Sequence, residues 1–258
     1  MNYEDLFKKS GEENERITLL NLYKKWRKIP NINNDSFTAD GFYPGYFSAK
    51  HKVLFIGREP RYAQKTGDKD RVTFDLAWFE KTLIEKKGLG AYWKRIYTLD
   101  DLIQAEKPVQ NNLIKDAKTI LARRKENNNY GIAIINISKY INEDEKSSGN
   151  KSNIKQINTF LKTPNNINFI RDEIMLLNPD IIIHANLWGC GIDRDYLNQI
   201  FPYLEKLGEE GSVILSDFRF NANNKPIKFI QTYHFSARKN PKNHFYDPVM
   251  KLLSKYYF

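Results

Sequence analysis

The sequence predicts an α/β fold, a three-layer α/β/α sandwich with a mainly parallel central sheet. Short apolar runs recur along the chain, and such runs are typical of strands that are buried on both faces. Segments of helical length separate the runs, so strands and helices alternate. The chain has 258 residues, of which 41% are hydrophobic, and this is enough for one domain with a substantial core.

The strands are predicted from apolar runs that end at a glycine or a polar residue. Four runs indicate parallel strands and a fifth indicates a further strand: 52–56, 132–135, 180–184, 228–233 and, as the fifth, 212–215. Gly57 stops the first run, Asn136 the second and His234 the fourth. Ligands of such sheets bind beyond the carboxyl ends of the strands, so the residues at these exits are the first candidates for a site.

Helices are predicted before and between these runs. An amphipathic segment over 4–28 is ended by Pro30, and a loop follows over 31–45. The other predicted helices are 74–87, 111–126, 153–177 with an interruption near Pro164, 193–207 and 246–257. We therefore expect residues 1–49 to form an N-terminal helical extension and loop, and residues 50–258 to form the α/β domain.

The chain is basic, with 41 Lys and Arg residues against 31 Asp and Glu residues and a formal net charge of +10. Such an excess favours a polyanionic partner such as nucleic acid, because neutralisation of phosphates drives this kind of binding. A lysine-rich, solvated surface is the equally weighted alternative.

The lone cysteine, Cys190, excludes a disulfide framework, a four-cysteine zinc site and a cysteine-ligated iron–sulfur cluster. The chemistry is therefore expected from oxygen, nitrogen and aromatic groups. No run of about 18 apolar residues occurs and the first residues include acids, so we expect no membrane span and a cytoplasmic location.

Three polar residues at the strand exits have side chains suited to catalysis or recognition. Glu59 precedes Pro60 and could orient water or stabilise a cation, the alternative being a loop acid paired with a neighbouring arginine. His234 could donate a hydrogen bond to a developing anion, or be structural. Asn136 has the donors and acceptor needed to read a planar base, although it is also a common turn former.

In combination, these exits resemble the uracil-DNA glycosylase superfamily. The first motif is Gly57-Arg58-Glu59-Pro60 after a short strand, and Asn136 ends a central strand. The second motif is His234-Phe235-Ser236-Ala237-Arg238, which continues as Lys239-Asn240-Pro241 and looks most like the single-strand-selective branch. The resemblance covers residues 50–258. It implies a DNA-binding enzyme of base-excision repair that flips a uracil or another damaged base and hydrolyses its N-glycosidic bond.

The resemblance also implies roles for individual residues. Glu59 would orient water and stabilise the cation, and His234 would stabilise the departing base. The base would be held by Asn136, Phe74, Gly57 and Arg58, with Phe74 as the stacking aromatic. DNA contacts would come from Ser236, Arg238, Lys239, Lys242 and Arg61, with Arg238 as the wedge that fills the vacated stack. No metal or other cofactor is implied.

The sequence also departs from the family pattern. Glu59 stands where the uracil-excising families have aspartate, and Phe235 and Ala237 replace two prolines of the second motif. Arg61 replaces the aromatic that in some families excludes the methyl group of thymine. Two alternatives therefore remain: a catalytically weak base- or nucleic-acid-binding module on the same fold, and an enzyme acting on free nucleosides or nucleotides. Arg238 and the net charge argue against the second alternative.

Other clusters have a structural interpretation that we favour over a functional one. Arg123, Arg124 and Lys125 are expected to form a solvated face. The aromatic residues Trp78, Tyr92, Trp93 and Tyr97 are expected in the core, with a base-stacking surface as the alternative. His184 and Trp188 are expected to pack structurally.

Overall fold

The computed structural model describes residues 3–60, 90–107, 117–127, 129–142 and 152–258. Within these residues seven strands form one sheet in the order β1-β3-β2-β4-β7-β6-β5. The strands are β1 (Gly41–Phe42), β2 (Val53–Gly57), β3 (Ala133–Asn136), β4 (Ile181–Ala185), β5 (Tyr203–Glu210), β6 (Val213–Arg219) and β7 (Ile227–Thr232). The helices are α1 (Tyr3–Ser10), α2 (Glu13–Trp26), α4 (Ala91–Ala105), α5 (Ala117–Glu126), α6 (Ile154–Lys162), α7 (Asn166–Leu177), α8 (Arg194–Ile200), a π-helical turn η2 (Lys242–Tyr246) and α9 (Asp247–Tyr256).

The centre of the sheet is parallel, as predicted. Strands β3, β2, β4 and β7 are parallel neighbours, and they correspond to the four apolar runs. The outer strands are antiparallel, with β1 on β3, β6 on β7 and β5 on β6. The fifth predicted strand exists as β6 and extends to Arg219. The fold is therefore mixed α/β with a sheet that is mostly parallel in its core.

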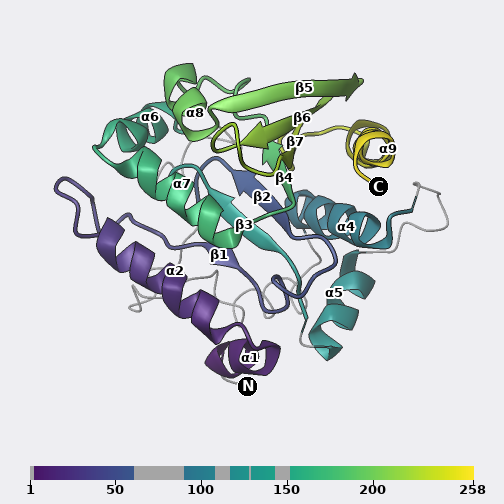
Figure 1. Ribbon diagram of the computed structural model, residues 1–258, viewed down its shortest axis with the longest axis horizontal. Helices are drawn as coiled ribbons and strands as arrows, with labels where there is room; N and C mark the ends of the chain where they lie inside the picture. The colour runs from purple at the N-terminus through teal and green to yellow at the C-terminus, as the bar shows by residue number, and fades with distance from the viewer. Residues whose placement is uncertain (1–2, 61–89, 108–116, 128, 143–151) are drawn as a thin grey trace.

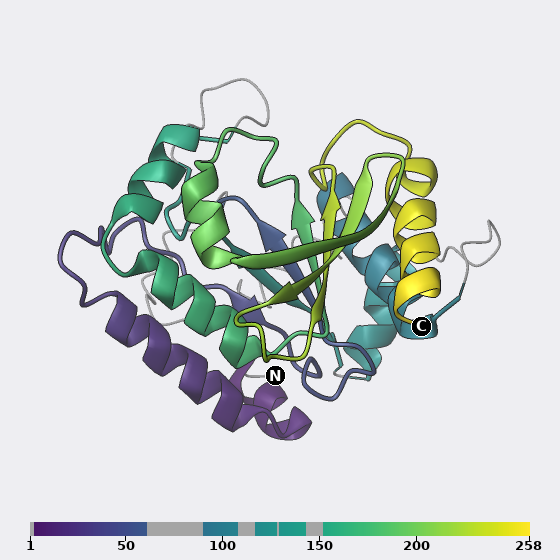
Figure 2. The ribbon, with the colours of Figure 1, turned by 45° about the horizontal axis from the view of Figure 1, so that its top comes forward.

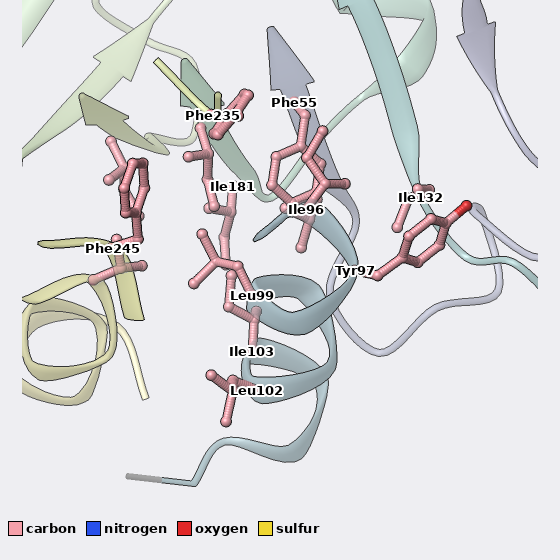
Figure 3. Packing of buried hydrophobic residues seen from close by; sticks show 14 of the residues in the cluster. Phe55, Ile96, Tyr97, Leu99, Leu102, Ile103, Ile132, Ile181, Phe235 and Phe245 are labelled. Carbon is pink, nitrogen blue, oxygen red and sulfur yellow. The ribbon is translucent and has the colours of Figure 1, made fainter. Parts of the chain in front are cut away.

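Helices cover both faces of this sheet (Figures 1 and 2). Side chains alternate along the strands, so Val53 and Phe55 pack in one core cluster and Leu54 and Ile56 in the other. The first cluster lies under α4, α5 and α9, and the second under α2, α6 and α7. Figure 3 shows the first cluster, where Ile96, Leu99 and other residues of α4 meet the sheet.

The predicted helix over 193–207 is wrong beyond Ile200. Helix α8 ends there, and residues 203–210 form the edge strand β5, which pairs with β6 through a turn at Gly211. The physical reason is Pro202, because proline disfavours the helical conformation of the residue before it and has no N–H for a helical hydrogen bond. Phe201 accordingly leaves the helical region, with φ −121° and ψ 72°.

The predicted helix over 4–28 is divided at Gly11, whose φ of +75° lies in the left-handed region. The interruption brings Glu12 to the loop after β1, where its carboxylate accepts hydrogen bonds from Gly45 N at 2.6 Å and Phe47 N at 2.7 Å. Residues of this expected N-terminal extension contribute β1 to the sheet and Trp26 to the core.

The remaining helix predictions have mixed outcomes. The interruption near Pro164 is confirmed, since α6 and α7 lie on either side of it, and the last helix is confirmed as α9. The expected helix over 74–87 and the first part of that over 111–126 lie outside the described residues. The sequence analysis predicted no element at α4. None of the described helices has the length and apolar character needed to span a membrane.

Candidate active site at the carboxyl edge of the sheet

The carboxyl ends of the four parallel strands meet at one edge of the sheet. Gly57 pairs with Asn136 across β2 and β3, and Ala185 pairs with Thr232 across β4 and β7. The chain passes from β2 to β3 on one side and then returns to β4 on the other side of β2. The carboxyl edge between β2 and β4 is therefore a topological switch point, the place where ligands of open α/β sheets bind.

Gly57 is required by the close approach of Asn136. A Cβ atom at position 57 would lie 2.5 Å from Asn136 Oδ1, which is closer than real Cβ atoms come to other atoms. The same Cβ would lie 3.5 Å from the hydroxyl oxygen of Tyr92. The absence of a side chain thus lets the Asn136 amide lie directly over the end of β2.

Asn136 is held in place by Asp40, a residue of the segment that leads into β1. Asp40 Oδ2 accepts from the backbone N of Asn136 at 2.7 Å and from its Nδ2 at 3.1 Å. Asn136 is 5% exposed and Asp40 is fully buried. The expected base-reading residue therefore has a defined orientation.

Asp40 belongs to a buried charged cluster that the sequence analysis did not identify. Lys139 Nζ donates to Asp40 Oδ1 and lies 2.7 Å from Glu173 Oε2. All three side chains are fully buried. The ammonium also lies over the rings of Tyr23 and Trp26, at 5.7 and 5.6 Å from the ring centroids. The cluster connects β1, the β3 exit, α2 and α7.

The Tyr23 hydroxyl contacts both carboxyl groups of this cluster. It has three acceptors around it, Asp40 O at 2.8 Å, Asp40 Oδ1 at 3.1 Å and the close Glu173 Oε1, to which it donates. Burial raises the pKa of Glu173 to about 8. The positive charge of Lys139 opposes this rise, and the negative charge of Asp40 adds to it.

Glu59, the expected water-orienting acid, is 7% exposed and lies at the first turn of α6. Its Oε1 accepts from Asn142 Nδ2 at 2.9 Å, and its two oxygens lie 3.2 and 3.1 Å from the backbone N of Asn153, the N-cap of α6. The partial positive charge of a helix N-terminus stabilises a carboxylate at this position. Glu59 thereby links the β2 exit to the segments that follow β3 and precede α6.

Arg58 lies across the switch point between β2 and β4. Its guanidinium donates to Ala185 O at 3.3 Å, Asn186 O at 3.4 Å and Ser152 Oγ at 3.4 Å. These acceptors belong to the β4 exit and to the segment before α6. Arg58 therefore links the β2 exit to the β4 exit and to the segment before α6.

His234 is half-buried at the exit of β7, and its ring bonds within its own loop. Nδ1 lies 2.7 Å from Ser236 Oγ and accepts from Ser236 N at 3.3 Å. A backbone N–H can only donate, so in the neutral ring the proton is on Nε2, which is then a donor. Ser236, which we expected on a DNA phosphate, contacts the histidine in this structure.

Phe235 anchors this loop where the family pattern has proline. It is fully buried and packs against Phe55, with ring centroids 5.7 Å apart (Figure 3). It also packs against Tyr92, with ring centroids 5.5 Å apart. Arg95 of α4 donates to Phe235 O and, at 3.1 Å, to Lys239 O. The loop is therefore fixed by a core side chain and two carbonyl contacts.

Tyr92 lies between the two ends of the candidate site. It is half-buried, its hydroxyl approaches Gly57, and its ring centroid is 6.2 Å from that of His234. Burial raises the pKa of its hydroxyl above the ordinary value, so Tyr92 is neutral at physiological pH. The core interpretation holds for Tyr97, which is fully buried, whereas Tyr92 and Trp93 are partly buried and pack against the first core cluster. The expected stacking residue Phe74, together with Trp78 and Arg61, lies outside the described residues.

The expected DNA-contacting residues follow the His234 loop. Arg238 and Lys239 are exposed, and the Lys239 ammonium lies 5.4 Å from the ring centroid of Tyr233. Lys242 is half-buried and paired with Asp247. These basic groups are close to His234 in the chain and present positive charge at this edge.

The prediction of a solvated face at Arg123, Arg124 and Lys125 is wrong for Arg124. This residue is 7% exposed and donates to Asp100 and to Tyr130 O, because α5 packs that side against α4. Arg123 pairs with Asp101.

The structural interpretation of His184 and Trp188 is confirmed by their packing. His184 is fully buried beside Trp188 and Phe229, with centroids 5.2 and 4.7 Å away, and burial lowers its pKa to about 3.

No family model matches the chain, and no curated protein matches its sequence. Among the described residues no group of three or more His, Cys, Asp or Glu side chains is arranged to hold a metal ion.

Proposed function

We propose that this chain binds DNA and hydrolyses the N-glycosidic bond of a flipped base, with uracil as the first candidate. The observation that carries the proposal is the juxtaposition of Gly57, Asn136 and the His234 loop at one edge of the sheet. These residues come from three separate strands, and the Asn136 amide lies directly over Gly57. A base-reading amide beside a hydrogen-bond donor is what recognition of an extruded base requires.

Tyr92 supports the same proposal because it spans the space between these groups. Its hydroxyl lies near Gly57 and its ring lies beside His234. A planar base stacked on this ring would have Asn136 at one edge and His234 at the other. Stacking on an aromatic ring contributes about 1–3 kcal/mol per base.

The reaction needs groups that stabilise two opposite charges. As the bond between C1′ and the base nitrogen breaks, its electron pair leaves with the base and positive charge develops on the sugar. The Glu59 carboxylate would stabilise that cation and orient the water whose oxygen bonds to C1′. His234 Nε2–H would donate to the oxygen of the anionic base, and the proton released by water would pass to the base.

One observation favours the second candidate, a base-binding module with weak or no catalysis. The Glu59 carboxylate is almost fully buried, and both of its oxygens have hydrogen-bond partners in Asn142 and Asn153. A carboxylate that links two segments in this way serves the structure of the edge. In this candidate Asn136, Tyr92 and the basic loop bind an unstacked base without hydrolysing it.

Assays of base release separate the candidates. Single- and double-stranded oligonucleotides containing uracil, hypoxanthine or an oxidised pyrimidine are incubated with the protein, and abasic sites are then cleaved with alkali. We expect release by the wild type, and losses of about 100-fold or more in Glu59→Gln and His234→Ala. Glu209→Gln is the matched control for the acid, because Glu209 is exposed on β5 in an ion pair with Lys206.

The other outcomes overturn this proposal in distinguishable ways. Salt-sensitive DNA binding without release of any base overturns the hydrolase and supports the binding module. Release that persists in both variants shows that other residues carry the chemistry. A wild type with no affinity for DNA at moderate salt excludes both candidates and directs attention to free nucleosides and nucleotides.

A further inference from the structure

Asp40 stands between the candidate site and the buried charged cluster, and it contacts both. Its Oδ2 accepts two hydrogen bonds from Asn136, one from the backbone and one from the side-chain amide. Its Oδ1 accepts from Lys139, whose ammonium also lies 2.7 Å from Glu173 Oε2. No other described residue is bonded to the Asn136 side chain in this way.

The chemistry of a carboxylate fixes which end of the Asn136 amide faces Asp40. An ionised carboxylate has acceptors only, so the amide atom 3.1 Å from Oδ2 is Nδ2. Oδ1 then lies on the other side, over Gly57, where the missing Cβ leaves room for it. Although burial opposes it, the negative charge of Asp40 raises the pKa of Lys139 above its ordinary value, so the counter-charge of Asp40 persists.

We infer that Asp40, anchored by Lys139, is a positioning residue that prevents the Asn136 amide from rotating and fixes the side on which it presents its oxygen. This inference rests on the proposed function in one respect, namely that the group bound by Asn136 is a base. A fixed amide presents an acceptor and a donor in one order. It therefore matches a base edge with a ring N–H beside a carbonyl, as in uracil or hypoxanthine, and opposes cytosine or adenine, where donor and acceptor are exchanged.

The variant Asp40→Asn tests the inference because it keeps the shape of the side chain and removes the charge. An amide at position 40 presents either oxygen or nitrogen to Asn136, so the orientation is no longer fixed. The matched control is Glu173→Gln, which makes the same change from acid to amide in the same buried cluster. Among the residues that the structure describes, Glu173 contacts Lys139 and Tyr23 and makes no hydrogen bond to Asn136.

The first measurement uses the free protein and does not depend on catalysis. In ¹⁵N-labelled wild type, we expect the Asn136 side-chain amide to show one proton protected from exchange and a scalar coupling to the Asp40 carboxylate carbon. We expect protection to fall about tenfold in Asp40→Asn and to persist in Glu173→Gln. Absence of protection and coupling in the wild type overturns the inference even if the variant does not fold, and unchanged protection in a folded Asp40→Asn overturns it as well.

The second measurement applies to base recognition. For release of uracil relative to cytosine from single-stranded oligonucleotides, we expect the ratio of kcat/KM values to fall about tenfold in Asp40→Asn and to stay near the wild-type value in Glu173→Gln. An unchanged ratio in a folded Asp40→Asn contradicts the positioning role. If the wild type releases no base, the proposed function fails, whereas the amide measurement still decides the role of Asp40.

Discussion

The two ends of the candidate site are held in opposite ways. At the Asn136 end, the side-chain amide is supported by Asp40, which is linked to Lys139 and Glu173; all three are fully buried ionisable groups from distant parts of the chain. At the other end, the His234 loop is supported by one apolar side chain, Phe235, and by Arg95. At both ends the supported residue is polar and lies at the edge of the sheet: Asn136 is nearly buried and His234 is half-buried.

The difference shows what each kind of support provides. Hydrogen bonds between buried charges are directional, and they fix the orientation of an amide whose two ends have almost the same shape. Such a cluster is costly to desolvate, and its stability depends on every partner. An apolar anchor fixes the position of a loop without fixing the rotation of its polar side chains. The ring of His234 is oriented separately, by its hydrogen bonds to Ser236.

Removal of one buried charge is expected to have the largest effect. Lys139→Met leaves the buried Asp40 carboxylate without its cation, and the free energy of unfolding is expected to fall by about 3–5 kcal/mol in urea denaturation. The control is Lys206→Met, because Lys206 is exposed in an ion pair with Glu209. A loss no greater than that of the control would mean that the buried cluster is not what holds the Asn136 end.

Truncation of the apolar anchor is expected to have a somewhat smaller effect. Phe235→Ala removes a fully buried ring that packs on Phe55 and Tyr92, and should cost about 3 kcal/mol. Phe258→Ala is the control, because that ring is 38% exposed. Hydrogen exchange should increase in the His234 loop and remain unchanged at the backbone amide of Asn136. An equal increase at both ends would contradict the separation of the two supports.

The pH dependence of stability sharpens the comparison further, because the Asn136 end contains Glu173, an acid with a raised pKa. Glu173 in the folded protein keeps its proton up to about pH 8, whereas in the unfolded chain it loses it near its ordinary value of 4.5. The folded state therefore binds more protons in this window, and stability falls as the pH rises towards 8, by at most about 1.4 kcal/mol per pH unit.

Glu173→Gln removes this proton, so the decline between pH 6.5 and 8 should become shallower. This range avoids His184, whose pKa is lowered to about 3 and which therefore destabilises the fold only as the pH falls below its ordinary value of 6.5. Urea midpoints measured between pH 6.5 and 8, and again below pH 6.5, test the assignment of this decline to Glu173. Equal slopes for wild type and variant between pH 6.5 and 8 would show that Glu173 is already ionised in the folded state.

The same contrast explains how much could be predicted from the sequence. The four central strands could be predicted because each is a short apolar run stopped by a polar residue or glycine, and the exits at Gly57, Asn136 and His234 follow from that pattern. Strand β5 could not be predicted in this way, because its residues are largely exposed and form no apolar run. The signal that the sequence does contain is Pro202, which ends the helix before this strand. The buried cluster has no local signal either, since its bonds join residues 96, 99 and 150 positions apart.

The smallest effect on stability is expected at Arg238, and it tests the exposed side of the His234 loop. Arg238 is exposed, so Arg238→Ala should leave the urea midpoint unchanged within error. If this residue contacts DNA, its loss should weaken binding to single-stranded oligonucleotides and reduce the slope of log K against log salt by about one. Lys251→Ala is the control, because Lys251 of α9 is also an exposed cation, and it pairs with Glu210 of β5. A change in affinity that is equal in both variants would mean that the net charge alone attracts DNA. A change confined to Arg238→Ala would locate binding at the end of the site whose support is apolar, where the basic side chains remain free to follow the backbone of the nucleic acid.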